Sequence, residues 1–162
     1  MDLQKEIIQL STQLVKRRLT ICTAESCTGG LISKLFTDNS GSSEWFDCAF
    51  VTYTNNAKQQ MLGVNPITIE SSGAVSQPTV IEMSEGAINK SNSNVSIAIS
   101  GVAGPSGGTK EKPVGMVWVS WSGKSYETLA QCFYFDGDRE SIRFQAAKAA
   151  IQGAVKYIVK NA

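Results

Sequence analysis

A short polar turn near the N-terminus contains a residue suited to nucleophilic chemistry. The apolar residues 19–24 lead directly into the sequence Glu-Ser-Cys-Thr-Gly-Gly at positions 25–30, in which Ser26 supplies a hydroxyl. The chain contains no histidine, the usual base for such a hydroxyl, so a Ser-His-Asp triad and an imidazole zinc site are both excluded. The proton of Ser26 must therefore go to another base. Lysine is the strongest candidate, because burial readily lowers its pKa.

Two further polar segments also follow apolar runs that are typical of strands. The first covers residues 53–58 and the second covers residues 100–105. Ligands of open α/β sheets bind at the carboxyl ends of strands, so the three segments are expected to converge on one pocket. Each segment alone also fits an ordinary turn, because glycine, serine, threonine and asparagine are turn-forming residues. The residues that would meet in the pocket include Tyr53, Asn55, Lys58, Ser100, Gly101 and Gly104.

The elements that position these segments can be predicted from apolar spacing and turn residues. Helical spacing predicts helices over residues 2–18, 30–37, 55–62 and 139–160. A further helix is expected to begin after Ser76, and residues 63–66 are interpreted as the end of the preceding one. Apolar runs predict strands over residues 19–24, 46–53, 95–99, 115–121 and 128–135.

The order of these elements predicts the fold class. Early alternation of strand and helix implies parallel pairing, whereas the last two strands are joined by a turn short enough for an antiparallel hairpin. We therefore expect one α/β domain over residues 1–162, with three α/β/α layers and a mixed, mostly parallel sheet.

The composition limits the partners and the location of the chain. The 15 basic and 14 acidic residues give a net charge of +1, so no overall field favours nucleic acid or an anionic membrane. No apolar run approaches the roughly 20 residues of a membrane helix, and the charged N-terminus lacks the apolar core of a signal peptide. The four cysteines have no Cys-x-x-Cys spacing and are expected to be free thiols. We expect a cytoplasmic protein that binds neither nucleic acid nor membranes.

The order and spacing of several short blocks resemble one known protein family. The blocks lie at residues 24–30, 41–43, 53–58, 73–76, 100–105, 107–109, 111–115 and 137–139. Together they resemble the C-terminal domain family of CinA, the competence-damage-inducible protein, over about residues 20 to 150. The resemblance implies a three-layer α/β/α fold with a mixed sheet. Stand-alone family members are nicotinamide-nucleotide amidohydrolases, so it also implies hydrolysis of the carboxamide of nicotinamide mononucleotide in pyridine nucleotide salvage, giving nicotinate mononucleotide and ammonia.

The resemblance assigns catalytic roles to residues of the first two segments. The family is described as Ser/Lys amidohydrolases, and its serine and lysine match Ser26 and Lys58. Without the resemblance, Ser26 would be interpreted as a helix N-cap and Lys58 as an ordinary solvated lysine. Tyr53 is either a core aromatic or a catalytic residue that relays a proton or orients the lysine. Cys27 is an alternative nucleophile, because thiols are intrinsically more reactive, but we interpret it as structural.

The remaining candidates would bind the nucleotide substrate. Arg139 and Arg143 are expected either to recognise a phosphate through the guanidinium fork or to form surface ion pairs. Glu25 could cap a helix, pair with the lysine or contact the substrate. Backbone N–H groups near Gly29 or Gly101 would stabilise the oxyanion. The full set of expected substrate-binding residues is Glu25, Thr28, Gly29, Gly30, Asn55, Ser100, Gly101, Gly104, Arg139 and Arg143.

Two other functions stay open for the same residues. The chain could be a non-catalytic module that binds a pyridine nucleotide, or an amidase that acts on another nucleotide-like amide. Release of ammonia from nicotinamide mononucleotide discriminates between these possibilities. The expected mechanism needs no metal ion and no organic cofactor, and a homo-oligomer is the default assembly.

Overall fold

The middle layer of the molecule is a five-stranded mixed sheet in a computed structural model that describes residues 2–162. Its strands are β1 (Ile21–Glu25), β2 (Phe46–Val51), β3 (Val95–Gly101), β4 (Met116–Gly123) and β5 (Tyr126–Tyr134). They lie in the order β2-β1-β3-β4-β5. The pairs of β1 with β2 and with β3 are parallel, and the pairs of β3 with β4 and of β4 with β5 are antiparallel. Parallel pairing is therefore concentrated at one end of the sheet.

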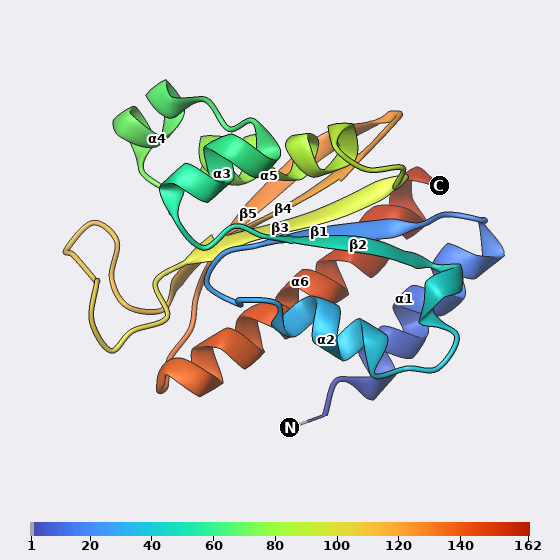
Figure 1. The fold of residues 1–162 in the computed structure, drawn as a ribbon. Coiled ribbons are helices and arrows are strands. Elements are labelled where there is room, and N and C mark those ends of the chain that lie inside the picture. The colour runs from blue at the N-terminus through green and yellow to red at the C-terminus, as the bar shows by residue number, and fades with distance from the viewer. Residues whose placement is uncertain (1) are drawn as a thin grey trace.

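Helices cover both faces of this sheet, as Figure 1 shows. One face is covered by α1 (Gln4–Lys16), α2 (Leu31–Thr37) and α6 (Arg139–Asn161). On the other side, α5 (Gln77–Asn89) packs on the sheet, and α3 (Asn55–Leu62) and α4 (Pro66–Ser72) pack against α5. This arrangement confirms the predicted three-layer α/β/α fold. Within residues 2–162, no helix combines the length and the apolar character needed to span a membrane.

The two faces of the sheet are packed differently. Beneath α1, α2 and α6 the core is large and apolar, and it includes Ile97, Val117 and Ile151. Beneath α5 the apolar core is smaller, and buried serine hydroxyls connect the helix to the sheet. Ser120 Oγ, for example, donates a hydrogen bond to Ser84 Oγ over 2.8 Å. Because these hydroxyls are hydrogen-bonded, their burial is tolerated.

The neighbouring ends of β1, β2 and β3 bring the predicted functional segments together. Backbone pairing continues past the end of β1, where the Ser26 amide donates to Ile99 O over 3.0 Å. On the other side, the Thr52 amide donates to Glu25 O over 2.9 Å. The segments that begin at residues 26, 52 and 100 therefore leave the sheet at the same edge, as expected for parallel strands.

Two local differences from the prediction lie on either side of α3, besides shifts of a few residues at other strand ends. Residues 63–66 do not simply end α3, because α4 follows at once: Asn65 Oδ1 accepts a hydrogen bond from the Ile67 amide over 2.9 Å. The prediction treated Pro66 as part of a helix end. Proline is tolerated in the first turn of a helix, where its missing N–H is not needed, and Pro66 therefore begins α4. The strand predicted for residues 46–53 ends at Val51. The carbonyl of Thr52 accepts a hydrogen bond from Lys58 instead.

Candidate active site

A cavity of about 300 Å³ lies at the carboxyl ends of β1 and β3. It combines hydroxyl, amide, ammonium and guanidinium groups with a few small apolar side chains. Most of the predicted catalytic and binding positions of the three segments meet there, although they are widely separated in sequence. The cavity is lined by Ser26, Cys27, Tyr53, Asn55, Lys58, Ala74, Val75, Ser100, Gly101, Ala103 and Arg139.

The central contact of the cavity joins Ser26 and Lys58. Lys58 Nζ lies 2.9 Å from Ser26 Oγ, which is hydrogen-bond distance. Ser26 is only 7% exposed, and its amide is held by Ile99 O, so the turn fixes the direction of its side chain. Lys58 comes from the first turn of α3, which Thr54 caps by accepting a hydrogen bond from the Ala57 amide over 3.0 Å. The cap and the strand end thus position the two groups independently.

Lys58 is buried without a negatively charged partner. Its side chain is 1% exposed, and none of the ion pairs among residues 2–162 includes it. Besides Ser26, Nζ donates to carbonyl oxygens of the segment that precedes α3: Thr52 O at 3.0 Å, Tyr53 O at 3.4 Å and Thr54 O at 3.5 Å. Burial disfavours the ammonium form and lowers the pKa of Lys58 below its ordinary value. This shift is the one that a general base in contact with a serine requires.

Glu25 acts as a helix cap and does not line the cavity. Its fully buried carboxylate accepts hydrogen bonds from the amides of Ile32 and Ser33, at 2.9 and 3.0 Å, and from Thr28 Oγ1 at 2.8 Å. An anion at a helix N-terminus is favoured by the free N–H groups and the dipole of the helix. Of the three alternatives for Glu25, the structure supports capping. The Thr28 hydroxyl is likewise occupied by Glu25 and does not face the cavity.

The glycines of the first segment shape the turn and do not line the cavity. Gly29 and Gly30 both have positive φ values, of 56° and 99°, a conformation that favours glycine. The Gly29 amide donates to Ser26 O over 3.0 Å, so it is not the free oxyanion donor that the sequence suggested. Gly104 also lies outside the cavity wall, although its carbonyl contacts a residue that lines it.

The two arginines of α6 have different environments. Arg139 lines the cavity and donates to Gly104 O over 2.8 Å and to the Tyr53 hydroxyl over 3.2 Å. Arg143, one helical turn later, does not line the cavity. It donates to backbone carbonyls of the turn that contains Ser26. The geometry therefore fits a phosphate role for Arg139 and not for Arg143.

Tyr53 lies at the mouth of the cavity. It is 59% exposed, so the interpretation as a core aromatic is wrong. Its hydroxyl is a hydrogen-bond partner of Arg139, and within residues 2–162 no hydrogen bond joins that hydroxyl to Ser26 or Lys58. The position fits contact with the substrate at the rim better than direct proton relay.

Sequence reasoning missed part of the cavity wall. Cys27, interpreted as structural, lines the cavity, but burial raises the pKa of its thiol to about 11. The thiol is therefore protonated at neutral pH, which disfavours it as the nucleophile. Ala74, Val75 and Ala103 were not singled out, because small apolar side chains carry no chemical signal. The block at residues 73–76 was nevertheless a usable indication, since it was among those that carried the resemblance.

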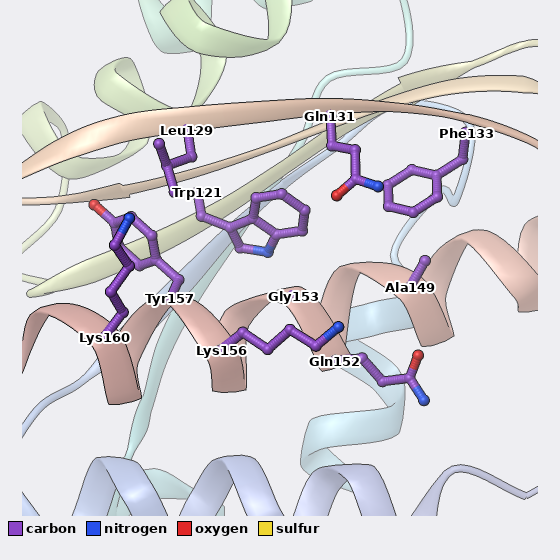
Figure 2. A pocket seen from close by; sticks show the side chains of 10 residues that line it. All are labelled: Trp121, Leu129, Gln131, Phe133, Ala149, Gln152, Gly153, Lys156, Tyr157 and Lys160. Carbon is purple, nitrogen blue, oxygen red and sulfur yellow. The ribbon is translucent and has the colours of Figure 1, made fainter.

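A second cavity of the molecule lies between the antiparallel strands and α6 (Figure 2). This groove of about 240 Å³ is lined by Trp121, Leu129, Phe133 and Lys156, among others. It contains no serine or cysteine beside a base. Among residues 2–162 no cluster of three His, Cys, Asp or Glu residues could hold a metal ion. Of these two cavities, the one at Ser26 places a hydroxyl in hydrogen-bond contact with a buried amine, an arrangement suited to nucleophilic catalysis.

Comparison with known families agrees with the resemblance inferred from the sequence. A family model described as the CinA C-terminal domain matches residues 3–158. The chain belongs to the CinA C-terminal domain family. The match extends beyond the blocks from which the resemblance was inferred and includes α1 and most of α6.

Similar members of the CinA family are known from several bacteria. Proteins from Enterobacter agglomerans and Escherichia coli (strain K12) are named nicotinamide-nucleotide amidohydrolase PncC. The first is 46% identical over 154 residues, covering 95% of this chain and 94% of the relative. The second is 45% identical over 160 residues, covering 96% and 97%. A crystal structure of a CinA superfamily protein from Klebsiella pneumoniae has a TM-score of 0.94 at 31% identity and covers 99% of both chains.

Proposed function

We propose that this chain hydrolyses the carboxamide of nicotinamide mononucleotide to nicotinate mononucleotide and ammonia, as a step of pyridine nucleotide salvage. The observation that carries the proposal is the 2.9 Å contact between Lys58 Nζ and Ser26 Oγ inside a cavity. The names of the similar proteins from Enterobacter agglomerans and Escherichia coli support the substrate. The proposal assigns Ser26 as the nucleophile and Lys58 as the base.

The surroundings of Lys58 suit a neutral amine. A neutral amine has two N–H donors and one lone pair. The carbonyls on the α3 side can accept both N–H groups, at Thr52 O and at either Tyr53 O or Thr54 O. The lone pair then faces Ser26, whose hydroxyl becomes the donor of the 2.9 Å hydrogen bond. Burial supplies the neutral form, and the carbonyls orient it.

The reaction would proceed through an ester on Ser26. As Oγ attacks the carboxamide carbon, Lys58 takes the hydroxyl proton, and a bond forms between Oγ and the carbon. The tetrahedral intermediate collapses by breaking the carbon–nitrogen bond, and Lys58 returns the proton to the departing nitrogen, which leaves as ammonia. Water then attacks the ester with Lys58 again as the base. This releases the nicotinate product and restores the hydroxyl of Ser26.

The oxyanion of the intermediate needs N–H donors close to Ser26. The Cys27 amide is the best-placed candidate, because Cys27 lines the cavity and within residues 2–162 its N–H has no acceptor. Backbone donors of this kind typically contribute 10²- to 10³-fold, roughly, to the rate of acyl transfer. We assign this role to Cys27 in place of Gly29.

The polar rim of the cavity would bind the rest of the nucleotide. Arg139 is the cationic side chain of the wall that remains for the phosphate once Lys58 is assigned as base. Asn55 and Ser100 offer an amide and a hydroxyl to the carboxamide or the ribose. The proposed substrate-binding set is therefore Tyr53, Asn55, Ser100, Gly101 and Arg139. The last four were expected from the sequence to bind the substrate, whereas Tyr53 was expected to be catalytic.

The test is release of ammonia from nicotinamide mononucleotide by the purified chain, with the riboside and free nicotinamide as comparison amides. Turnover of the mononucleotide that is lost in Ser26→Ala supports the proposal. Binding of the mononucleotide without ammonia release would instead support a non-catalytic nucleotide-binding module. We also propose a cytoplasmic homo-oligomer, which cell fractionation and light scattering would test.

A further inference from the structure

Arg143 makes an unusual pair of contacts with the backbone of the nucleophile turn. From the second turn of α6, its Nε donates to Cys27 O over 3.0 Å and its Nη2 donates to Thr28 O over 2.9 Å. Both are charge-assisted hydrogen bonds from one planar guanidinium group. A Cβ placed on Gly29 would lie 3.4 Å from Nη2, so the guanidinium packs directly against the turn.

These contacts fix the orientation of the peptide groups after Ser26. The Ser26 carbonyl accepts from the Gly29 amide over 3.0 Å, and the next two carbonyls accept from Arg143; Thr28 O also accepts from the Leu31 amide over 2.9 Å. In a trans peptide the N–H points away from the C=O, so a carbonyl held on one side directs the amide of the following residue to the other. Within residues 2–162, the amides of Cys27 and Thr28 have no acceptor. Two successive free N–H groups in a turn form a concavity that binds anions.

We propose that Arg143 is the positioning residue of this turn and keeps the N–H groups of Cys27 and Thr28 free for the oxyanion. Its contact with Cys27 O fixes the peptide that carries the Thr28 N–H. Its contact with Thr28 O fixes the peptide of the Gly29 N–H, which in turn holds Ser26 O and thereby directs the Cys27 N–H. This inference rests on the proposed amide hydrolysis. Arg143 does not touch the substrate; it acts through the backbone. It also places a positive charge behind two carbonyl oxygens, which adds to the favourable potential for a developing oxyanion.

Glu25 also holds this turn, but at a different place from Arg143. The buried Glu25 carboxylate holds the amides of Ile32 and Ser33 and so fixes the side of the turn that leads into α2. The Glu25 carboxylate only accepts hydrogen bonds, so it cannot hold the carbonyls of residues 27 and 28. Arg143 donates to both from a different helix. Thr28 O also accepts from the Leu31 amide, so the contact with Cys27 O is the one that depends most on Arg143. A lysine would not replace it, because a point-like ammonium cannot hold two carbonyls in the fixed geometry of the fork.

The decisive experiment compares Arg143→Ala with the wild type in steady-state kinetics on nicotinamide mononucleotide. We expect kcat to fall by about 10- to 100-fold, since a small misplacement of oxyanion donors is sufficient for this. KM should change less than about threefold, because an interaction made only in the transition state is lost. Low, non-denaturing guanidinium should restore part of kcat in Arg143→Ala, whereas methylammonium should not. Unchanged kcat, or a raised KM for the mononucleotide but not for its riboside, would overturn the proposal.

A matched control and a milder variant distinguish a loss of positioning from a loss of the fold. Lys148→Ala removes a charge from the same helix, at a half-exposed side chain whose ion pair is with Glu6 over 3.7 Å, and should keep wild-type kinetics without response to guanidinium. Arg143→Lys keeps the charge and should show a smaller fall in kcat than Arg143→Ala. Equal kcat for Arg143→Lys and the wild type would contradict a need for the fork.

A second readout separates this inference from the proposed function. Acylation of Ser26 by p-nitrophenyl acetate, followed by the mass of the peptide that contains it, reports the nucleophile and the oxyanion site without any nucleotide. If the wild type is acylated but does not hydrolyse nicotinamide mononucleotide, the proposed substrate fails while Arg143 can still be tested. Acylation of Arg143→Ala at the wild-type rate would then overturn the positioning role.

Discussion

The cavity at Ser26 and the groove beside Trp121 have similar volumes, about 300 and 240 Å³, but they lie on opposite halves of the sheet. The cavity opens where the parallel strands β1 and β3 end. The groove lies between the antiparallel strands β4 and β5 and α6, and its wall is mainly aromatic and aliphatic (Figure 2). The apolar groove resembles an ordinary small-molecule pocket more closely. Size and apolar character therefore do not identify the reactive site of this molecule.

The difference that matters is how each region treats its buried polar groups. The indole N–H of Trp121 donates to Ala150 O over 2.9 Å, which satisfies it within the fold. Lys58, in contrast, is buried without a carboxylate, although burying an unpaired charge is costly. A position with only a structural role would favour an apolar residue of similar volume there. The uncompensated lysine beside Ser26 indicates that the parallel half carries the chemistry.

The largest effect is expected when the pair in the cavity is broken. Ser26→Ala, Lys58→Met and Lys58→Arg should each lower kcat by about 10³-fold or more, because nucleophile and base act as a unit. Lys58→Arg best distinguishes proton transfer from an electrostatic role, since guanidinium keeps the charge but does not deprotonate. Ammonia release and thermal melting of each variant would be measured together. Near-normal turnover in folded Lys58→Arg would reduce Lys58 to an electrostatic role.

Cys27→Ala is the matched variant for this first prediction. Its thiol is next to Ser26 and lines the same cavity, but its raised pKa keeps it protonated at neutral pH. Cys27→Ala should keep most of the activity, because the oxyanion donor at this position is the backbone N–H. An inactive Cys27→Ala beside an active Ser26→Ala would transfer the nucleophile to the thiol.

The pH dependence tests the same pair without mutation. Burial lowers the pKa of Lys58, and the base must be neutral to accept the proton of Ser26. Below that pKa only a fraction of the enzyme is competent, so kcat/KM should rise about tenfold per pH unit and level off once Lys58 is deprotonated. The levelling should come at a pH below the ordinary pKa of lysine. A profile that is flat across the neutral and alkaline range would remove Lys58 from proton transfer.

A smaller effect is expected at the rim. Arg139→Ala should raise KM for nicotinamide mononucleotide by roughly tenfold, the loss of one charge-assisted hydrogen bond, and change KM for the riboside much less. Variants of Arg143 should lower kcat instead. This contrast would distinguish phosphate recognition by Arg139 from positioning of the Ser26 turn by Arg143, although both residues belong to α6. Equal changes for both substrates would remove Arg139 from the phosphate site.

The sequence predicts the fold and the convergence of the three polar segments well for a physical reason, whereas the choice of Lys58 as the base rested on the family resemblance. Apolar spacing marks the strands and helices, and the ends of parallel strands must meet at one edge, so Ser26 and Lys58 were expected to converge. The absence of histidine restricted the base to very few residue types. Their contact distance and the burial of Lys58 follow only from the three-dimensional placement of α3 beside the turn that contains Ser26.

The substrate-binding residues were harder to predict because their roles depend on direction. Glu25 and Arg143 are polar residues near the site, but both point to backbone groups and not into the cavity. Their spacing places Arg139 and Arg143 on the same face of α6. Arg139 nevertheless lines the cavity, whereas Arg143, one helical turn later, holds the backbone of the turn that contains Ser26. Ala74, Val75 and Ala103 line the cavity without any chemical signature in the sequence.

The smallest catalytic effect is expected from a change in the groove. A Cβ on Gly153 would lie 2.0 Å from Trp121 Cζ2, so Gly153→Ala forces the indole or α6 to shift. Overpacking of this kind lowers the free energy of unfolding by about 1–3 kcal/mol, visible as a lower Tm. The kcat of the folded fraction should stay within about twofold of the wild type, because Gly153 is ten residues along α6 from Arg143, about 15 Å. A loss of kcat that exceeds the loss of folded protein would show that α6 transmits strain from the groove to the turn that holds Ser26.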